Sequence, residues 1–494
     1  MLVKTSQLQA IEEWSDHSED AVIRAYAGTG KTTALVHVGH RHPQRIYLYV
    51  PFNKSAQLDA SRRMPKSVIC RTFNSLGWEA MEVSKTWGFD GIANSIRMAP
   101  IQLAKRLRLQ DETEVTVVKE TLRFYLNSAD EELSGKHVPR DAQRRFTDAK
   151  ERRGFVEAMV RGATLLWRLM QDPHKTDFPM SHDGYMKLWL LNGGVLPYLE
   201  GELQGLFLDE AQDMNPVNWA LAQGWNLPTF VVGDSFQQIY AFRGAVDALQ
   251  KVDYPTRLWL SRSFRFGPAL AELANGLLTL GQDTPEVLLE GNPDLDTKLL
   301  DPSSPRPKGK HTVLCRTNFG LMEEALKAVR QGQSIAVVGN IKDAVARMKS
   351  AWALYNEDLP KVKHADIRLF GEWDALVAAS NDDADLKVTV QRIQEYGGQI
   401  PRICADLSRS AEVSEDAADV VLSTAHKAKG REWDIVVLAN DFPELVKFDT
   451  ETETWKVNAQ ERNLLYVAAT RGIRQVTLNP PCLIAQAKGQ SLAG

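Results

Sequence analysis

The sequence has few cysteines, no long hydrophobic run and no large excess of charge of either sign. Its four cysteines, Cys70, Cys315, Cys404 and Cys482, are far apart and form no CxxC pair. This spacing excludes a disulfide framework and a cysteine zinc site, and it favours reduced, buried thiols. No run approaches the roughly 18 apolar residues of a membrane span, and the first residues lack the apolar core of a signal peptide. We therefore expect a cytoplasmic protein without a membrane partner.

The balance of charge limits how the chain could bind nucleic acid. Lys and Arg total 59 and Asp and Glu total 63, so a surface that is basic all round is excluded. A nucleic-acid partner would need a local basic groove. Apolar residues make up 44% of the sequence, which predicts ordered globular structure. A chain of 494 residues is too long for one hydrophobic core, and roughly three or four domains are expected.

Short apolar runs recur along the chain, and each ends in a polar or glycine-rich turn. They are nearly continuous in hydrophobicity, which is typical of strands buried on both faces of a parallel sheet. Helix-like stretches separate them, so the predicted fold class is α/β. The runs lie at 22–26, 46–50, 68–70, 205–208, 229–232, 257–260, 312–315, 335–338, 420–422 and 435–438.

The runs form two groups, which predict two parallel-sheet lobes. The first lobe comprises 1–77 and 200–255, and the second comprises 256–340 and 401–494. The stretch 78–199 lacks such runs and is predicted to be a helical insertion in the first lobe. A smaller insertion is predicted at 341–400 in the second lobe, from its helical pattern and mixed charge.

A glycine-rich loop follows the first predicted strand, with the sequence AYAGTGKTT over 25–33. Gly28 and Gly30 allow backbone N–H groups to face a polyphosphate, which also meets the N-terminus of the next helix. Lys31 would neutralise the β- and γ-phosphates, and the Thr32 hydroxyl would bind Mg²⁺. An ordinary glycine-rich turn is the alternative, but strand, loop, GK[ST] and helix in this order disfavour it. The other loop residues expected at the nucleotide are Ala27, Thr29 and Thr33.

An acidic pair ends the predicted strand at 205–208, in the sequence DEAQD. A carboxylate at the end of a parallel strand beside a phosphate loop can hold Mg²⁺, and its neighbour can polarise the attacking water. We therefore assign Asp209 to the metal and Glu210 to the catalytic base. A solvated acidic turn is the alternative, and the phosphate loop upstream argues against it.

A third strand, at 229–232, leads into GDSFQQIYAFRGA. Gln237 lies near the strand end, where it could sense the γ-phosphate of the nucleotide. Tyr240, Phe242 and Arg243 are flat groups that could stack on nucleic-acid bases. For the aromatic side chains the alternative is packing in the core.

Together these blocks, in this order, resemble superfamily 1 helicases of the UvrD/Rep group. The resemblance implies two RecA-like P-loop lobes, ATP and Mg²⁺ as cofactors, and single-stranded DNA and single-strand/double-strand junctions as partners. Residues 181–189 and the sequence HKAKGREWD are most similar to the F-box DNA helicase branch. No F-box sequence precedes the phosphate loop, so we do not expect a ubiquitin-ligase role.

The resemblance also implies roles for individual residues. Arg265 would reach the γ-phosphate, and Arg471, in the last motif, would be the arginine finger. Asn74 stands where the family usually has histidine, and Phe264 where tyrosine is common. The further residues assigned to the nucleotide are Gln7, Phe264, Gly430 and Glu432. Those assigned to DNA, beside the aromatic block above, are Phe52, Asn53, Thr72, Phe73, Asn74, Arg316, Thr424 and His426.

The function implied is an ATP-dependent single-stranded DNA translocase or helicase, moving 3′ to 5′ in DNA repair, recombination or replication. Only about 159 residues separate Arg265 from Thr424, which leaves a reduced second insertion. We therefore expect weak unwinding by a monomer, and a need for a protein partner or self-association. The alternatives are a translocase that only displaces proteins, a motor or regulatory ATPase subunit of a larger complex, for example with a nuclease in phage defence, and a P-loop kinase. The block from Gln237 to Arg243 disfavours the kinase.

Overall fold

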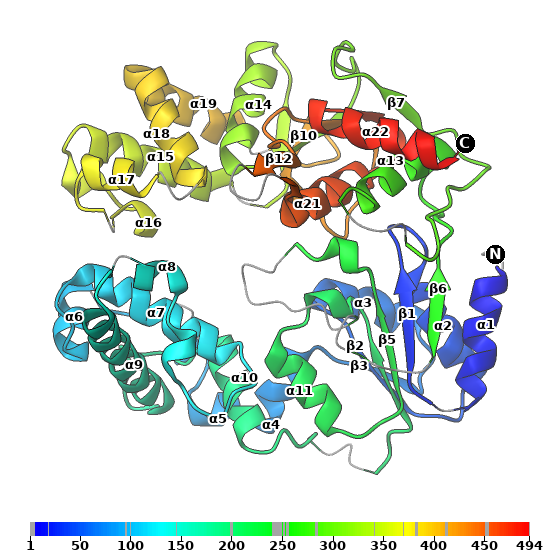
Figure 1. Cartoon of the computed structure of the whole chain (residues 1–494), viewed down its shortest axis with the longest axis horizontal. Coiled ribbons are helices and arrows are strands. Elements are labelled where there is room, and N and C mark those ends of the chain that lie inside the picture. The colour runs from blue at the N-terminus through cyan, green and yellow to red at the C-terminus, as the bar shows by residue number, and fades with distance from the viewer. Residues whose placement is uncertain are drawn as a thin grey trace. The chain divides into compact units, whose positions relative to one another are not determined.

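The computed structural model of the chain divides into two compact units. Unit 1 comprises Met1–Ala25 and Gly30–Leu260, and unit 2 comprises Tyr26–Thr29 and Ser261–Gly494 (Figure 1). The structure describes residues 5–17, 19–93, 96–98, 100–144, 146–197, 201–239, 249, 252, 256–281, 285–339, 341–368, 370–380, 384–410, 413–449 and 454–493. Across these residues, none of the helices has the length and apolar character needed to cross a membrane.

Unit 1 is built on a six-stranded parallel sheet with the order β3-β2-β4-β5-β1-β6. Successive residues of β1 pack on opposite faces, since Ile23 joins one hydrophobic cluster and Val22 another. Burial on both faces explains the continuous apolar runs and confirms the predicted α/β class. The strands are β1 (Ala21–Ala25), β2 (Tyr47–Val50), β3 (Val68–Cys70), β4 (Gly205–Leu208), β5 (Thr229–Gly233) and β6 (Arg257–Leu260).

Helices cover both faces of this sheet. Leu8 of α1 and Leu35 of α2 are buried against one face, together with Phe230 of β5. Side chains at the N-caps fix where several helices begin, because they accept the first free backbone N–H groups. Thr5, Asn53 and Thr72 do so for α1, α3 and α4. These helices are α1 (Ser6–Trp14), α2 (Lys31–Arg41), α3 (Lys54–Arg63), α4 (Phe73–Ala80) and α11 (Pro216–Gly224).

The predicted helical insertion is helical in the structure. Figure 1 shows its helices α6 to α9 grouped together, coloured from cyan to dark teal, and α7 packs along α9. Met159 and Leu166 of α9 lie in the same hydrophobic cluster as Val22 of the sheet, so the insertion shares its core with the lobe. The helices are α5 (Val83–Thr86), α6 (Pro100–Leu107), α7 (Glu112–Leu126), α8 (Arg140–Arg144), α9 (Ala149–Gln171) and α10 (His182–Leu191).

Unit 2 contains a second six-stranded parallel sheet, with the order β7-β14-β11-β8-β10-β9, and a separate antiparallel hairpin. The run at 257–260, which we assigned to the second lobe, is strand β6 of the first sheet, where it pairs with β1. The strands are β7 (Lys298–Leu300), β8 (His311–Cys315), β9 (Ile335–Val337), β10 (Val420–Thr424), β11 (Trp433–Leu438) and β14 (Gly472–Thr477), and the hairpin is β12 (Val446–Asp449) and β13 (Thr454–Val457).

The stretch that we predicted as a small insertion in the second lobe forms helices that share the core of unit 2. Met348 of α15 and Ile393 of α18 are buried in one cluster with Val313 of β8. The helices of unit 2 are α13 (Pro268–Leu278), α14 (Asn318–Arg330), α15 (Ile341–Tyr355), α16 (Ala365–Arg368), α17 (Trp373–Ala379), α18 (Ala384–Tyr396), α19 (Ile400–Ser410), α20 (Ala425–Ala428), α21 (Ala459–Ala469) and α22 (Pro480–Ala493).

Candidate functional site

The glycine-rich loop joins β1 to α2 in the geometry expected of a phosphate-binding loop. Gly28 and Gly30 have φ angles of 76° and 83°, in the left-handed region that glycine adopts without steric cost. Helix α2 begins at Lys31, directly after Gly30. Its first N–H groups therefore lie at the loop, where they can bind an anion. Thr33, also predicted at the nucleotide, accepts a 2.5 Å hydrogen bond from Arg63.

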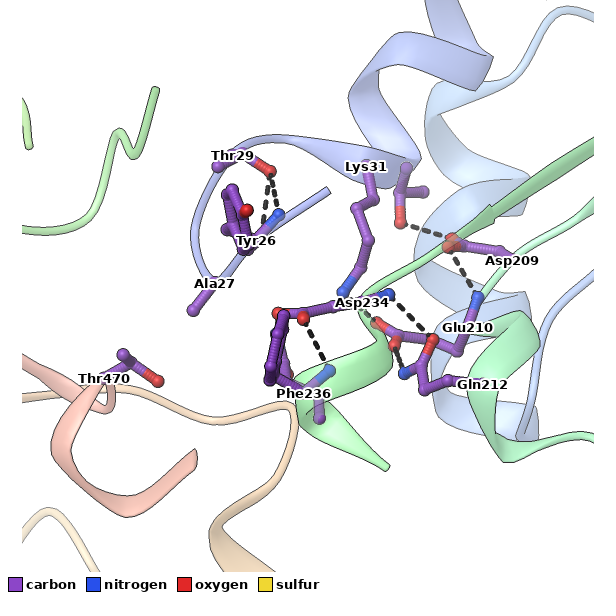
Figure 2. A network of polar contacts seen from close by, with 12 residues as sticks. Tyr26, Ala27, Thr29, Lys31, Asp209, Glu210, Gln212, Asp234, Phe236 and Thr470 are labelled. Atoms are coloured by element: carbon purple, nitrogen blue, oxygen red, sulfur yellow. Dashed lines mark hydrogen bonds and ion pairs between the residues drawn. The ribbon is translucent and has the colours of Figure 1, made fainter. Parts of the chain in front are cut away.

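Lys31 is largely buried and faces the acidic pair that follows β4 (Figure 2). Its Nζ lies 3.1 Å from Oε1 of Glu210. Burial opposes the charged ammonium, but the combined attraction of Glu210, Asp234 and Asp209 outweighs it and raises the pKa of Lys31. The lysine is therefore charged at neutral pH and surrounded by carboxylates that a nucleotide phosphate could replace as its partner.

Asp209 is the centre of a compact polar group at the end of β4. Its Oδ2 accepts hydrogen bonds from the Thr32 hydroxyl at 2.6 Å and from the Tyr49 hydroxyl at 2.8 Å. Burial, and then the charge of Glu210, raises the pKa of Asp209, against the opposite effects of Thr32, Lys31 and Tyr49. Such a carboxylate gains from a cation nearby.

The side chains at this point fit Mg²⁺ bound together with a nucleotide. Thr32 and Asp209 place two oxygen ligands side by side, and Mg²⁺ usually takes one or two protein oxygens, with phosphate oxygens and water filling its other positions. A cage made by the protein alone is not found, since no group of three or more His, Cys, Asp or Glu suited to a metal occurs in the described parts of the chain.

Glu210 has an unusual backbone conformation for its residue type. Its φ angle is 55°, in the left-handed region, which costs a residue other than glycine about 1–3 kcal/mol. Its N–H donates to Oδ1 of Asp209 at 2.9 Å, and its Oε2 accepts from the Gln212 amide at 2.5 Å. These bonds hold the carboxylate next to Lys31, as its predicted role as a base requires.

The turn after β5 carries the predicted phosphate sensor. Gln237 lies in the 3₁₀ turn η4 (Ser235–Gln237), and its amide donates to Oδ2 of Asp234 at 2.7 Å. Asp234 also accepts from the Phe236 N–H at 3.0 Å, and only 1% of its surface is exposed. The loop with Tyr240, Phe242 and Arg243 lies outside the described residues.

The first part of the glycine-rich loop makes its contacts within unit 2. The Ala27 N–H donates to the Tyr466 hydroxyl at 3.0 Å, and the Phe264 N–H donates to the Gly28 carbonyl at 2.8 Å. Thr29 is buried, and its hydroxyl donates to the Tyr26 carbonyl at 2.9 Å. Phe264, predicted to stack on adenine, is thus tied through its backbone to the loop.

Arg265 and Glu432, which we predicted at the γ-phosphate and the nucleotide, form an ion pair with each other. The Arg265 Nε lies 2.7 Å from Glu432 Oε2, and its Nη1 donates to the Thr470 carbonyl at 3.1 Å. Gly430, which precedes Glu432, has a φ of 81°, so the loop needs glycine there. Gln7 lies half-buried on α1 of unit 1.

Arg471 is buried in unit 2, with only 2% of its surface exposed. Its Nε donates to the Val467 carbonyl at 2.8 Å, Nη1 to the Arg431 carbonyl at 3.3 Å and Nη2 to the Thr470 hydroxyl at 3.2 Å. The guanidinium therefore closes the C-terminal end of α21. Its predicted role as an arginine finger stays a prediction.

A cavity of about 1260 Å³ lies within unit 1, next to the acidic pair. All five residues of unit 1 that the resemblance assigned to DNA line it, together with Asp209, Glu210 and residues of the helical insertion. Phe52 is 46% exposed, whereas Phe73 is buried and stacks on Trp225 at 5.8 Å. The cavity residues relevant to a strand are Phe52, Asn53, Lys54, Thr72, Phe73, Asn74, Lys119, Arg123, Asn127 and His182.

Lys119 of α7 is the insertion's distinctive contribution to this cavity. Among the residues that the structure describes, it has no hydrogen-bond or ion-pair partner. Desolvation by its surroundings lowers the pKa of its ammonium. Because the residue is exposed, its ammonium is accessible to an anionic ligand.

The predicted DNA contacts of unit 2 have other bonds in the structure. Arg316 follows β8 and forms a bidentate ion pair with Glu461 of α21, with N–O distances of 2.8 to 3.0 Å. Thr424 is the N-cap of α20 and accepts from the Lys427 N–H at 3.4 Å, and His426 lies on the same short helix. The Arg316 pair identifies a structural role that the sequence did not predict.

Three polar side chains of the site went unnoticed in the sequence: Tyr49, Gln212 and Asp234. Tyr49 lies in a strand, where an aromatic residue suggests only packing. Gln212 and Asp234 stand within blocks that we had singled out, DEAQD and GDSFQQ, and each follows a strand end. Their position at the carboxyl edge of the parallel sheet was the available signal.

Comparison with protein families gives two matches along the chain. The model for the UvrD/REP helicase N-terminal domain matches residues 3–252. The model for the UvrD-like helicase C-terminal domain matches residues 393–478. The first covers the phosphate loop, the acidic pair and the helical insertion, and the second covers Thr424, Glu432 and Arg471.

Similar curated proteins are helicases by name. F-box DNA helicase 1 of Gallus gallus is 28% identical over 91% of this chain and 46% of its own length. F-box DNA helicase protein 1 of Schizosaccharomyces pombe is 29% identical, over 96% of this chain and 57% of its own length. ATP-dependent DNA helicase UvrD2 of Mycobacterium bovis is 25% identical over 53% of this chain and 45% of its own length. The chain thus spans about half the length of the curated relatives it matches.

Proposed function

Because the chain belongs to the UvrD/REP helicase family, we propose that it is an ATP-dependent motor that moves along single-stranded DNA and acts as a DNA helicase. The observation that carries this proposal is the grouping of Lys31, Thr32, Asp209 and Glu210 beside a cavity lined by the predicted strand contacts. ATP chemistry and strand binding then share one edge of unit 1. Movement 3′ to 5′ and a role in DNA repair, recombination or replication follow the family resemblance.

ATP and Mg²⁺ would be held chiefly by the loop and the acidic pair. The loop N–H groups and Lys31 would bind the phosphates, while Thr32 and Asp209 would bind the metal. The metal would neutralise charge on the phosphates during transfer to water. Lys31 exchanges its partner Glu210 for phosphate when the nucleotide binds, which frees Glu210 to accept a proton from the attacking water.

Arg265 and Arg471 are the proposed cationic groups that complete hydrolysis. Both are bonded within unit 2: Arg265 to Glu432 and the Thr470 carbonyl, and Arg471 to the Val467 and Arg431 carbonyls and the Thr470 hydroxyl. For either guanidinium to stabilise the transition state, it must leave part of this bonding. A requirement of this kind makes hydrolysis depend on a conformational step.

The strand would lie in the cavity of unit 1. Phe52 offers an exposed ring on which a base can stack, and Lys119, unpaired among the described residues, offers an ammonium for a phosphate. Neither contact reads base identity, so little sequence preference is expected. Replacing Lys119 with Ala should weaken binding of the strand and leave ATP binding intact. The slope of the logarithm of DNA affinity against the logarithm of salt concentration should become shallower by about one, because one phosphate contact is lost. An unchanged salt slope would show that Lys119 does not contact a phosphate of the strand.

Unwinding by a monomer is expected to be weak, and a protein partner or self-association would strengthen it. Among the described residues, helices at 341–410 contribute buried side chains to the core of unit 2. The test compares strand displacement on a 3′-tailed partial duplex with displacement of a protein block from single-stranded DNA, at protein concentrations that keep the chain monomeric. Protein displacement without unwinding defines a translocase, and robust unwinding by the monomer contradicts the expected dependence on a partner.

A further inference from the structure

Gln212 is a buried side chain that bonds to two parts of the catalytic edge of unit 1. It is 0% exposed. Its Nε2 donates to Oε2 of Glu210 at 2.5 Å, and its Oε1 accepts the backbone N–H of Asp234 at 3.0 Å (Figure 2). The donor and acceptor ends of one amide are thus both used, one on the acidic pair and the other on the turn after β5.

The surroundings of Gln212 define this orientation. A Cβ atom added at Gly233 would lie 2.4 Å from Gln212 Oε1, so only glycine leaves space for the amide. On its other side, Glu210 adopts the left-handed conformation that turns its carboxylate toward Gln212 and Lys31. A left-handed backbone at Glu210 and a close approach at Gly233, one at each neighbouring strand end, therefore coincide at a single side chain.

The carboxylate of Glu210 uses its two oxygens differently. Oε1 lies 3.1 Å from Lys31, and Oε2 accepts from Gln212. A nucleotide phosphate competes for Lys31 but not for the Gln212 amide, which has no charge to offer it. When Lys31 moves to the phosphate, the bond from Gln212 remains to keep the carboxylate in place.

The Oε1 atom of Gln212 bonds to Asp234, which lies in the segment that precedes the predicted base-stacking residues Tyr240, Phe242 and Arg243 in the sequence. Asp234 accepts from the Phe236 N–H and from the Gln237 amide, which fixes the turn 234–237. A shift of this turn therefore moves the acceptor end of Gln212, and its donor end with it. The path from Gln237 through Asp234 and Gln212 consists of hydrogen bonds between buried groups and ends on the partly exposed Glu210.

We propose that Gln212 is a positioning residue that aims the Glu210 carboxylate and links it to the turn at 234–237. The proposal rests on the proposed function, since it assumes that Glu210 acts as the base of ATP hydrolysis. Gln212 itself would touch neither nucleotide nor water. Its loss should therefore lower the rate of hydrolysis and the response to DNA, and leave ATP binding nearly unchanged.

The test is ATP hydrolysis by Gln212→Met, with and without single-stranded DNA. Methionine keeps the length of the side chain and removes both hydrogen bonds. By analogy with the loss of groups that orient catalytic ligands, we expect kcat to fall about 10- to 100-fold and KM for ATP to change less than about threefold. The matched control is Gln223→Met, an exposed glutamine of α11 in the same unit. A Gln212→Met enzyme with the wild-type kcat and DNA stimulation would overturn the proposal.

A second variant tests the same link from its other side. Gly233→Ala places a methyl group against Gln212 Oε1 and should lower kcat in the same manner, without altering any group of the acidic pair. In a Glu210→Gln background, Gln212→Met should add no further loss in single-turnover hydrolysis, because its effect passes through Glu210. Independent, multiplicative losses would contradict the positioning role. A wild-type chain without ATPase activity would instead contradict the proposed function, so the two failures differ.

Discussion

The two regions that carry the predicted nucleotide chemistry differ in what their charged side chains bind. At the strand ends of unit 1, Glu210 joins Lys31 to Asp209: its carboxylate contacts Lys31 and its N–H donates to Asp209. In unit 2, Arg265 and Arg471 are bonded to other groups of that unit, among them the carbonyls of Thr470, Val467 and Arg431. The charged groups of unit 1 thus already lie together, whereas the arginines of unit 2 would need new partners to reach a phosphate. The difference suggests that unit 1 determines nucleotide binding and that unit 2 controls the rate.

The largest effect is expected at Glu210. Glu210→Gln removes the proposed base and keeps the size of the side chain, although its one carbonyl oxygen can accept from only one of Lys31 and Gln212. ATP hydrolysis should fall about 10²- to 10⁴-fold. Nucleotide and DNA binding should persist, which equilibrium titrations would show. Glu202→Gln, an exposed residue of the same unit, is the control. Hydrolysis at a near-normal rate would show that another group acts as the base.

The next effect concerns Tyr49, which orients the carboxylate of Asp209. Tyr49→Phe removes only the hydroxyl, and the Mg²⁺ concentration for half-maximal ATPase activity should rise about 10-fold or more. Tyr47→Phe on the same strand is the matched control, since the Tyr47 hydroxyl contacts Arg45 and not the acidic pair. An equal Mg²⁺ requirement in both variants would show that Tyr49 only packs.

Much of the fold and of the unit 1 site could be predicted from the sequence because their signals are local. Continuous apolar runs identified the buried strands, and the polar residues directly after them identified Lys31, Asp209 and Glu210. Strands β7 and β14 were missed because KLL is short and GIRQVT mixes polar residues with apolar ones. The sheet to which 257–260 belongs depends on its pairing with β1, which no local pattern contains.

Partners of polar side chains were the least predictable part. From the sequence, Arg316 was predicted to contact DNA. Its partner Glu461 lies 145 positions later, and only the fold brings the two side chains together. The same holds for Gln212 and Asp234, whose bond joins the ends of two strands. Residue type and spacing therefore predicted that Lys31, Asp209 and Glu210 would lie together, but they did not predict which side chains orient them.

A variant of Arg316 tests whether this arginine stabilises unit 2 through its ion pair with Glu461 or contacts DNA. Arg316→Ala breaks a largely buried bidentate pair, and the free energy of unfolding should fall by about 1.5 kcal/mol. Affinity for single-stranded DNA and its salt dependence should not change. Arg330→Ala, exposed on α14, is the control. If DNA affinity falls instead and the salt slope drops by about one, Arg316 contacts the strand as the resemblance implies.

The smallest effect is expected at Glu432, which pairs with Arg265 on the surface of unit 2. If Arg265 must leave Glu432 to reach a phosphate, Glu432→Gln should strengthen ATP binding about 1.5- to 5-fold, the range of a largely exposed ion pair. If Glu432 contacts the nucleotide itself, the same variant should weaken binding. Glu444→Gln, exposed in the same unit, is the control, and the KM and equilibrium affinity for ATP distinguish the two roles.

The most direct test of a DNA-driven motor is ATP turnover by the whole chain with and without single-stranded DNA, compared between wild type and Lys31→Ala. We expect DNA to stimulate the wild type strongly, and Lys31→Ala to lose about 10²-fold or more of the stimulated rate. Lys85→Ala, an exposed lysine paired only with Glu82 among the described residues, should behave as the wild type. An ATP turnover rate that single-stranded DNA does not change, or that stays the same in Lys31→Ala, would contradict a motor built on this phosphate loop.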